Sequence, residues 1–349
     1  MEPVTAQELA DTLAAAASQR QSIKLGNTPP GVTGDVEIST SRMTGLLEYE
    51  PRDLTVSVEA GMKYSELQRL LAANNQMVPL DPPWDEEVTL AGILGANLNG
   101  PRRRLYGTAR DLVIGMTFAT LDGKLVKTGG MVVKNVAGLD MGKLIIGSFG
   151  TLAAIATVNF KLNPIPKESA TLRFSFDSAT AAFALRDRIL KGQLQPAALD
   201  LLNPSASEAV QLPSAWNLLL QAVVMPERFT REYAGSTIVD DSIWRTVANF
   251  PARSSAQIIA RCSTTHMGMK DLVRDGITTP VIARAASGIV YLYDPVSLPE
   301  KAPYVLERAP AGVDRWPNPD PGSLAVMRNI KNMLDPQGLL NKGALYGRI

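Results

Sequence analysis

Apolar residues recur at helical spacing in two N-terminal segments. In the first, residues 3–19, Thr5 followed three residues later by Glu8 has the pattern of a capping box. The second, residues 65–74, has its leucines at helical spacing behind Ser65, which we expect to be the N-cap. Both segments are therefore predicted to be helices.

Alternation of apolar and polar residues with period two predicts strands. Residues 54–60 alternate regularly, and the pattern stops at Gly61. Two strand patterns within residues 111–127 flank Asp122-Gly123, a dipeptide typical of a tight turn, so a hairpin is expected there. Further strands are predicted over residues 22–25, 36–39 and 151–162.

The chain changes character twice. Residues 79–110 are rich in proline and glycine, and we expect a built loop there rather than a core element. Pro164 and Pro166 indicate a domain junction. Beyond them, strand and helix patterns mix without a strict βαβ rhythm, which favours an α+β domain with an antiparallel sheet. The predicted elements of this part cover residues 171–176, 179–190, 218–224, 288–292 and 324–334.

The composition excludes several classes of protein. Of 349 residues, 45% are hydrophobic and 20% are charged, so a large core can be buried and a mainly disordered chain is excluded. The length suggests about two domains. Lysine and arginine number 35 against 34 acidic residues, a net charge of +1, whereas nucleic-acid binding needs a strong basic excess. No nucleic-acid partner is expected.

Cysteine and histidine each occur once, as Cys262 and His266. One cysteine cannot form an internal disulfide or hold an iron–sulfur cluster, and one histidine cannot form a di-histidine site, so no metal is expected. No segment approaches 18 continuous apolar residues, and the N-terminus lacks the pattern of a signal peptide. We therefore expect a cytoplasmic protein without a membrane span, which partners could still hold at a membrane.

Three clusters carry candidate chemistry. In the first, Gly26-Asn27-Thr28 follows a strand, and such a turn either points amides at a phosphate or is an ordinary strand exit. It matches neither a P-loop nor a Rossmann fingerprint. The second cluster, residues 89–97 with 106–111, has small residues that either admit a flat or anionic ligand or allow tight packing.

Charged residues beside these clusters have two interpretations each. Arg102-Arg103-Arg104 is either a solvated face or a phosphate clamp. The third cluster contains Lys134 and Asp140, which form either a buried ion pair or part of a ligand-facing loop.

Taken in order, these clusters resemble the FAD-binding domain of the vanillyl-alcohol oxidase / p-cresol methylhydroxylase (PCMH-type) flavoprotein superfamily. The likeness is strongest to the FAD-binding E subunits of bacterial glycolate oxidases. It covers residues 1–166 and the C-terminal end. The matching stretches are residues 47–56, 59–61, 79–83, 97–101, 106–111, 134–138 and 334–341.

The resemblance implies an α+β protein of three parts. These are a PCMH-type FAD-binding domain of two subdomains over residues 1–166, an α+β cap domain with an antiparallel sheet over 167–322, and a C-terminal segment, 323–349, that returns to the FAD domain. The implied cofactor-binding residues are Gly26, Asn27, Thr28, Thr89, Ala91, Gly92, Ala96, Asn97, Gly107, Arg110, Asp111, Gly150, Thr151 and Ile155.

The resemblance also implies how the cofactor is held. Histidyl or cysteinyl attachment could use only His266 or Cys262, and both lie outside the family's tether positions, so non-covalent FAD is expected. The phosphate loop departs from the family's Gly-x-Gly-Thr form. Asn27 replaces the second glycine, and Pro29 and Pro30 have no N–H to donate.

The function that follows is an FAD-binding subunit of a glycolate-oxidase-like complex, which passes electrons to or from a catalytic flavin subunit and an iron–sulfur subunit. One alternative is a structural subunit that kept the fold and lost FAD, motivated by Asn27, the two prolines and Ala91. Another is a stand-alone FAD-dependent 2-hydroxy-acid dehydrogenase. Arg261 and Arg284 are candidate carboxylate binders, but the sequence assigns no catalytic residue.

Overall fold

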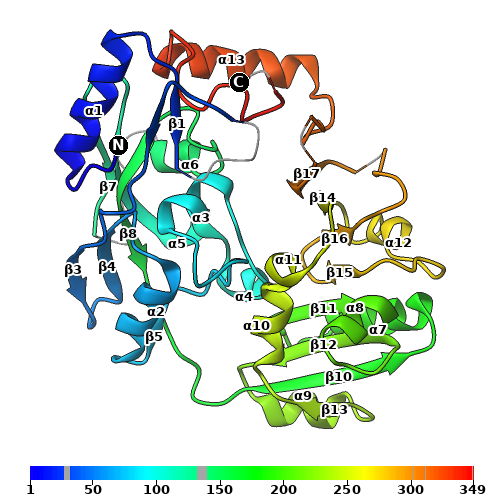
Figure 1. Cartoon of the computed structure of the whole chain (residues 1–349). Coiled ribbons are helices and arrows are strands. Elements are labelled where there is room, and N and C mark those ends of the chain that lie inside the picture. The colour runs from blue at the N-terminus through cyan, green and yellow to red at the C-terminus, as the bar shows by residue number, and fades with distance from the viewer. Residues whose placement is uncertain (27–31, 132–139, 301, 311, 348) are drawn as a thin grey trace. The chain divides into compact units, whose positions relative to one another are not determined.

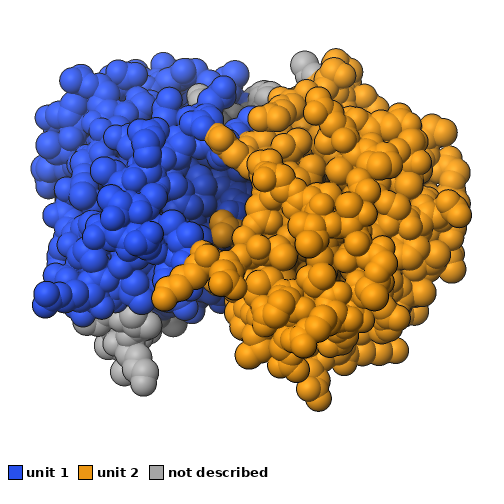
Figure 2. Space-filling view, turned by 90° about the horizontal axis from the view of Figure 1, so that it is seen from below, with its two compact units in different colours: residues 1–99, 108–165, 318–349 blue, residues 100–107, 166–317 orange. Residues whose placement is uncertain are grey.

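The structure is a computed structural model that describes residues 1–26, 32–131, 140–300, 302–310, 312–347 and 349. It divides into two compact units, which Figure 2 colours separately. Unit 1 is built from both ends of the chain and unit 2 mostly from its middle. Unit 1 comprises residues 1–99, 108–165 and 318–349, and unit 2 comprises residues 100–107 and 166–317.

Unit 1 contains an antiparallel sheet of order β3-β4-β8-β6-β7 within its described residues, and β1 pairs with β2 in parallel (Figure 1). Its strands are β1 (Ile23–Leu25), β2 (Val36–Ile38), β3 (Leu46–Glu50), β4 (Thr55–Glu59), β5 (Gln76–Met77), β6 (Val113–Ala119), β7 (Leu125–Gly129), β8 (Ala154–Lys161) and β9 (Asn163–Pro164). Its helices are α1 (Ala6–Ser18), α2 (Tyr64–Ala72), α3 (Leu90–Ala96), α5 (Ala109–Leu112), α6 (Met141–Ile145) and α13 (Pro321–Leu334).

Local signals set the first helix and the hairpin as predicted. Thr5 caps α1, since its hydroxyl accepts a hydrogen bond from the Glu8 N–H at 3.1 Å. The Glu8 carboxylate accepts from the Val4 N–H at 2.8 Å, one residue before the cap. Strands β6 and β7 form the expected hairpin.

The prediction that Ser65 caps α2 is wrong. The helix begins at Tyr64, and Lys63 is its N-cap residue without a side-chain bond to the helix. Tyr64 is drawn into the first turn because its ring is buried and its hydroxyl donates to the Val78 carbonyl at 2.7 Å. A tertiary contact therefore moves the helix start by one residue.

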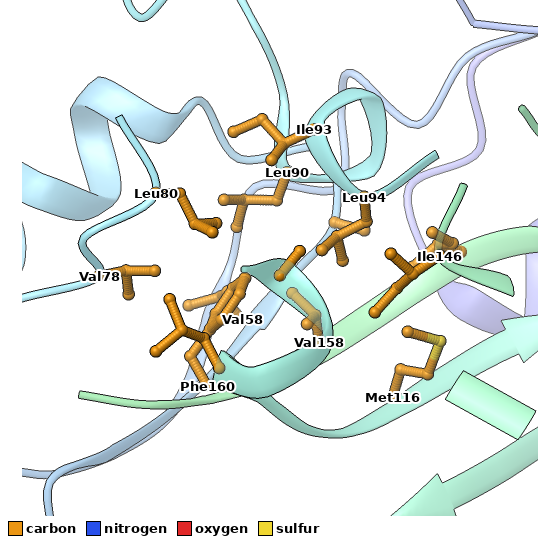
Figure 3. Packing of buried hydrophobic residues seen from close by; sticks show 14 of the residues in the cluster. Val58, Val78, Leu80, Leu90, Ile93, Leu94, Met116, Ile146, Val158 and Phe160 are labelled. Carbon is orange, nitrogen blue, oxygen red and sulfur yellow. The ribbon is translucent and has the colours of Figure 1, made fainter. Parts of the chain in front are cut away.

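The prediction of a loop over residues 79–110 is wrong for α3. Leu90, Ile93 and Leu94 are spaced as one helix face, are fully buried, and belong to the same core cluster as Val58 and Phe160 (Figure 3). A glycine inside a helix costs about 1 kcal/mol. Burying one such leucine or isoleucine contributes about 1.5–3 kcal/mol, so core packing outweighs the two glycines of α3.

The C-terminal segment adds to the small parallel sheet of unit 1. Beyond α13, Leu340 forms a parallel bridge with Ile23. The Ile23 N–H donates to the Leu339 carbonyl, and the Asn341 N–H donates to the Ile23 carbonyl, both at 2.8 Å. Strand β1 therefore lies between β2 and the end of the chain.

Unit 2 is built on an antiparallel sheet of order β13-β10-β12-β11-β15-β16-β14-β17 among the described residues. Its strands are β10 (Ala170–Phe176), β11 (Ala198–Leu202), β12 (Trp216–Ala222), β13 (Thr237–Val239), β14 (Ile259–Ser263), β15 (Val281–Arg284), β16 (Ile289–Tyr293) and β17 (Tyr304–Arg308). Its helices are α4 (Arg103–Tyr106), α7 (Ala179–Lys191), α8 (Pro204–Ala209), α9 (Pro226–Glu232), α10 (Ile243–Ala248), α11 (Phe250–Arg253) and α12 (Met269–Leu272).

Helices cover both faces of the unit 2 sheet. Leu199 and Leu201 of β11 point to one face, in the core cluster that includes residues of α7, α9 and α12. Ala198 and Leu202 point to the other, in the cluster that includes residues of α8, α10 and α11. Both large sheets are antiparallel, which confirms the predicted α+β class.

Candidate functional site

A turn over residues 147–151 packs on the C-terminal end of α3. The Gly147 N–H donates to the Leu94 carbonyl and the Phe149 N–H donates to the Gly95 carbonyl, both at 2.9 Å. Asn97, the C-cap of α3, has the left-handed φ of 50° that asparagine tolerates better than most residues. These bonds join the second predicted cluster to Gly150 and Thr151.

The first cluster reaches the same place through Asn341. Its side-chain oxygen accepts from the Leu25 N–H at 2.6 Å, and its side-chain nitrogen donates to the Phe149 carbonyl at 2.7 Å. Gly26 follows Leu25 directly. Unit 1 thus brings together Gly26, the end of α3 and the 147–151 turn. Asn27 and Thr28 lie outside the described residues.

The first amides of α3 are already occupied. The Leu90 N–H donates to the Met62 carbonyl at 3.0 Å, and the Ala91 N–H donates to the Ala60 carbonyl at 2.7 Å. The Gly92 N–H donates to the Thr89 hydroxyl at 3.2 Å. The amides of Leu90, Ala91 and Gly92 are therefore not free to bind a phosphate.

Three positions in unit 1 fit a flavin nucleotide. Apart from the neighbouring backbone, a Cβ at Gly26 or at Gly95 would meet no atom of the described residues within 4 Å, so there is open space at both positions. Gly26 also has a φ of +57°, which favours glycine. The Ser148 hydroxyl is buried and has no hydrogen-bond partner among the described residues, and a polar ligand edge would satisfy it.

The other predicted residues have varied surroundings. Asp111 is exposed, and its carboxylate accepts from the Thr108 N–H and hydroxyl at 2.8 Å, which lowers the pKa of Asp111. Arg110 beside it is exposed. Gly107 has a φ of 86° and groups with unit 2. Ala96 is half-buried at the end of α3, Thr151 is buried in the 147–151 turn, and Ile155 is buried in β8 opposite Phe118.

Two charged segments have two predicted interpretations each. Asp140 caps α6, accepting from the Lys143 N–H at 3.2 Å, while Lys134 lies outside the described residues. Arg104 is half-buried and donates to the Ala286 carbonyl at 3.3 Å and to the Gln195 side chain at 2.8 Å. Arg104 is therefore partly held by bonds within unit 2, and both interpretations of the 102–104 run stay predictions.

Both candidate carboxylate binders of unit 2 already have carboxylates. Arg284 is buried and bonds to the buried Asp200. Arg261 bonds to Glu307 at 2.5 Å. Tyr291 lies beside Arg284, whose guanidinium is 5.5 Å from the centre of the Tyr291 ring, and burial raises the pKa of Tyr291. A substrate carboxylate would have to displace an internal partner from either arginine.

Cys262 and His266 have no flavin-tethering geometry of their own. Cys262 is buried in β14, where burial raises the pKa of its thiol to about 12. His266 is exposed, and its carbonyl accepts from Arg186 at 3.2 Å. Among the described residues, no cluster of histidine, cysteine and carboxylate groups could hold a metal ion. Within that same part of the chain, no helix is long and apolar enough to cross a membrane.

Sequence reasoning missed Asn341, Lys331 and Ser148. Lys331 is buried, and its ammonium donates to the Thr151 carbonyl at 2.6 Å. Asn341 stands in the C-terminal stretch that carries the resemblance, but the pattern alone does not indicate which earlier residues it contacts. Ser148 lies in the stretch Gly147-Ser148-Phe149-Gly150, and nothing in that pattern indicates that its hydroxyl is buried without a partner.

Comparison with known proteins identifies the class. Residues 1–129 match the family model of the FAD binding domain, and residues 318–345 match that of the C-terminal domain of FAD linked oxidases. Alkyldihydroxyacetonephosphate synthase has the same fold, with a TM-score of 0.74 at 16% identity over 98% of this chain and 75% of that one. Residues 1–129 are thus similar to FAD binding domains and the C-terminal end is similar to that of FAD-linked oxidases, and both matches support FAD as the cofactor.

Within that class the chain is similar to subunits of glycolate oxidase. It is 35% identical to glycolate oxidase subunit GlcE of Escherichia coli over 49% of this chain and 47% of that protein. It is 31% identical to glycolate oxidase subunit GlcD of Bacillus subtilis over 51% of this chain and 38% of that protein. It is 24% identical to the mitochondrial D-lactate dehydrogenase [cytochrome] of Arabidopsis thaliana over 89% of this chain and 65% of that protein. The alignments to the two glycolate oxidase subunits thus span about half or less of those proteins.

Proposed function

We propose that this chain is the FAD-binding subunit of a glycolate-oxidase-like complex that oxidises a 2-hydroxy acid. It holds FAD non-covalently between Gly26, α3 and the 147–151 turn. When bound, the flavin accepts electrons as a pair and can release them singly. The partners are a catalytic flavin subunit and an iron–sulfur subunit. The cytoplasmic location stays a prediction.

The similarity to GlcE carries this proposal, and the charges in unit 2 support an electron-transfer role over independent catalysis. Oxidation of a 2-hydroxy acid needs a base for the hydroxyl proton and a cation for the carboxylate. Arg261 and Arg284 are neutralised by Glu307 and Asp200. The single histidine, His266, is exposed. We therefore expect the substrate to be oxidised on the partner subunit.

The visible absorption spectrum tests the cofactor. The chain is purified alone, incubated with FAD, freed of excess flavin and precipitated with acid. A flavin spectrum that moves to the supernatant supports non-covalent FAD, and a colour that stays in the pellet contradicts it. With an artificial electron acceptor, the isolated chain should not turn over glycolate or D-lactate. Turnover would instead favour a stand-alone dehydrogenase.

A matched variant locates the site. Gly95→Leu places a side chain where a Cβ meets no other atom within 4 Å, so the chain should fold while the flavin is excluded. Leucine also favours helix over glycine by roughly 1 kcal/mol. A melting temperature without FAD that is unchanged or higher, together with loss of flavin retention, is the expected result. Full retention by Gly95→Leu would contradict a site at this end of α3.

One observation favours a second candidate, a scaffold subunit without FAD. The amides of Leu90, Ala91 and Gly92 in α3 are occupied. Pro29 and Pro30, which follow Gly26 in the sequence, have no N–H to donate to a phosphate. A protein that stays colourless after incubation with FAD, both alone and co-expressed with its partner subunits, would establish the scaffold function.

A further inference from the structure

Asn341 connects two segments that are far apart in sequence. Its side chain is fully buried, and it bonds the Leu25 N–H on one side and the Phe149 carbonyl on the other. Leu25 is the last residue of β1, directly before Gly26, and Phe149 directly precedes Gly150. The bridge therefore lies between two segments that the proposed function assigns to FAD.

The Asn341 side chain joins the two segments directly, while Lys331 links the Thr151 carbonyl to the neighbouring Leu340 carbonyl. A Cβ at Gly150 would lie 2.6 Å from the Asn341 side-chain nitrogen, so the glycine is required for the close approach. The Gly26 N–H is bonded to the Ile38 carbonyl at 2.8 Å, which ties that residue to β2. Among the described residues, the Asn341 side chain is thus the link that joins Leu25 to the backbone of residues 149–151 by direct hydrogen bonds.

The amide group suits this position chemically. A carboxamide carries an acceptor and a donor at fixed spacing in one plane, so it can hold an N–H and a C=O of different segments at once. A carboxylate would accept from Leu25 but could not donate to Phe149. Asn341 also has a φ of 41°, a conformation that asparagine and glycine tolerate better than other residues.

We propose that Asn341 is a positioning residue for the cofactor. It fixes Leu25 and Gly26 relative to Gly150 and Thr151, so that these backbone segments are pre-organised before FAD binds. The C-terminal segment thereby sets the affinity for FAD. This inference rests on the proposed function, because it presumes that FAD binds at these segments. Pre-organisation raises affinity by removing the cost of ordering loops on binding.

The test uses Asn341→Gly in the full chain. Glycine keeps the left-handed backbone without strain and removes only the side-chain bridge. The matched control is Asn203→Ala in unit 2. Asn203 is also fully buried and also bridges segments, accepting from the Val281 N–H at 2.9 Å and donating to the Thr279 carbonyl at 2.8 Å.

Two quantities are measured on each flavin-free protein: the FAD dissociation constant from quenching of flavin fluorescence, and the melting temperature without FAD. We expect Asn341→Gly to raise the dissociation constant at least about ten-fold, a shift of about 1.4 kcal/mol. Its visible circular dichroism at saturating FAD should also change. Asn203→Ala should lower the melting temperature by about as much as Asn341→Gly does. It should leave the FAD dissociation constant within about two-fold of the parent value.

The outcomes separate the two proposals. A parent chain that binds no FAD refutes the FAD-binding function itself. A parent that binds FAD while Asn341→Gly binds it equally well refutes only the positioning role. If Asn341→Gly does not fold, Asn341→Asp keeps the acceptor for Leu25 and loses the donor to Phe149. Weaker FAD binding by that variant supports the proposal, and unchanged binding overturns it.

Discussion

Replacing Lys331 by methionine should destabilise unit 1 strongly. Lys331 lies on α13 with only 6% of its surface exposed. Its ammonium donates to the Thr151 carbonyl and to the Asp335 carboxylate, both at 2.6 Å, and to the Leu340 carbonyl at 2.8 Å. All three donors of the group are thus used, and burial lowers the pKa of Lys331 while Asp335 opposes the shift.

The magnitude follows from what the substitution leaves behind. Methionine has similar length and fills most of the space, so the cavity term is small. Asp335 stays buried with its charge and loses its cation, and removing one partner of a buried ion pair costs about 3–5 kcal/mol. Asp335 still accepts from the Leu339 and Leu340 N–H groups, which keeps the loss toward the lower end of that range.

The assay has to resolve the two units, since a chain of two units need not unfold in one step. We would follow urea unfolding by pulsed hydrogen exchange and read peptides of unit 1 and unit 2 separately. Lys331→Met should lower the stability of unit 1 by about 3 kcal/mol or more and leave unit 2 unchanged.

Arg328→Met on the exposed side of the same helix is the control, with an expected effect within about 0.5 kcal/mol. A loss below about 1 kcal/mol for Lys331→Met, or one no larger than that of the control, would refute the reasoning about the buried ion pair.

Three further predictions concern single residues. Cys262 should resist iodoacetamide at pH 8 in the native protein, because a thiol pKa of about 12 leaves roughly one thiol in ten thousand as thiolate. It should react with iodoacetamide after the protein is unfolded in denaturant, and full alkylation of the native protein would show that β14 opens. Gly61→Ala should cost about 3 kcal/mol or more by denaturant titration, since a Cβ would lie 1.7 Å from the Thr40 carbonyl oxygen. Asp111→Ala should cost about 1 kcal/mol as a lost helix cap. Because the Thr108 N–H lowers the pKa of Asp111 below 3.8, this contribution is present above pH 3.8 and is lost as pH falls through the lowered pKa. FAD affinity should not change, and weaker binding would show that Asp111 contacts the cofactor.

Short-range patterns in the sequence predicted the elements that short-range physics controls. Residues a few positions apart determine the Thr5 cap, the hairpin around Asp122-Gly123 and the helix that ends at Leu334. The start of α2 and the existence of α3 depended on distant contacts instead. For α3, two glycines indicated a loop, while three buried apolar side chains decided for a helix.

The candidate site shows the same division. The glycine-rich stretches could be recognised because glycine at a positive φ or a close approach has a local signature. The hydrogen bonds that bring these stretches together could not be predicted from the sequence. The side chain of Asn341 reaches Leu25 from 316 positions away, and Lys331 reaches Thr151 from 180 positions away. A single sequence carries no local signal for such pairs.

The discontinuous layout of unit 1 has a consequence during synthesis. The first two parts of unit 1, residues 1–99 and 108–165, leave the ribosome before residues 166–317 of unit 2, and the segment that completes the small parallel sheet, residues 318–349, follows last. Until that segment emerges, the N–H groups of Ile23 and Leu25 lack their native acceptors. Unit 2 can meanwhile complete nearly all of its own sheet and cores. Unit 1 is therefore the part of the nascent chain that depends longest on protection from misassociation.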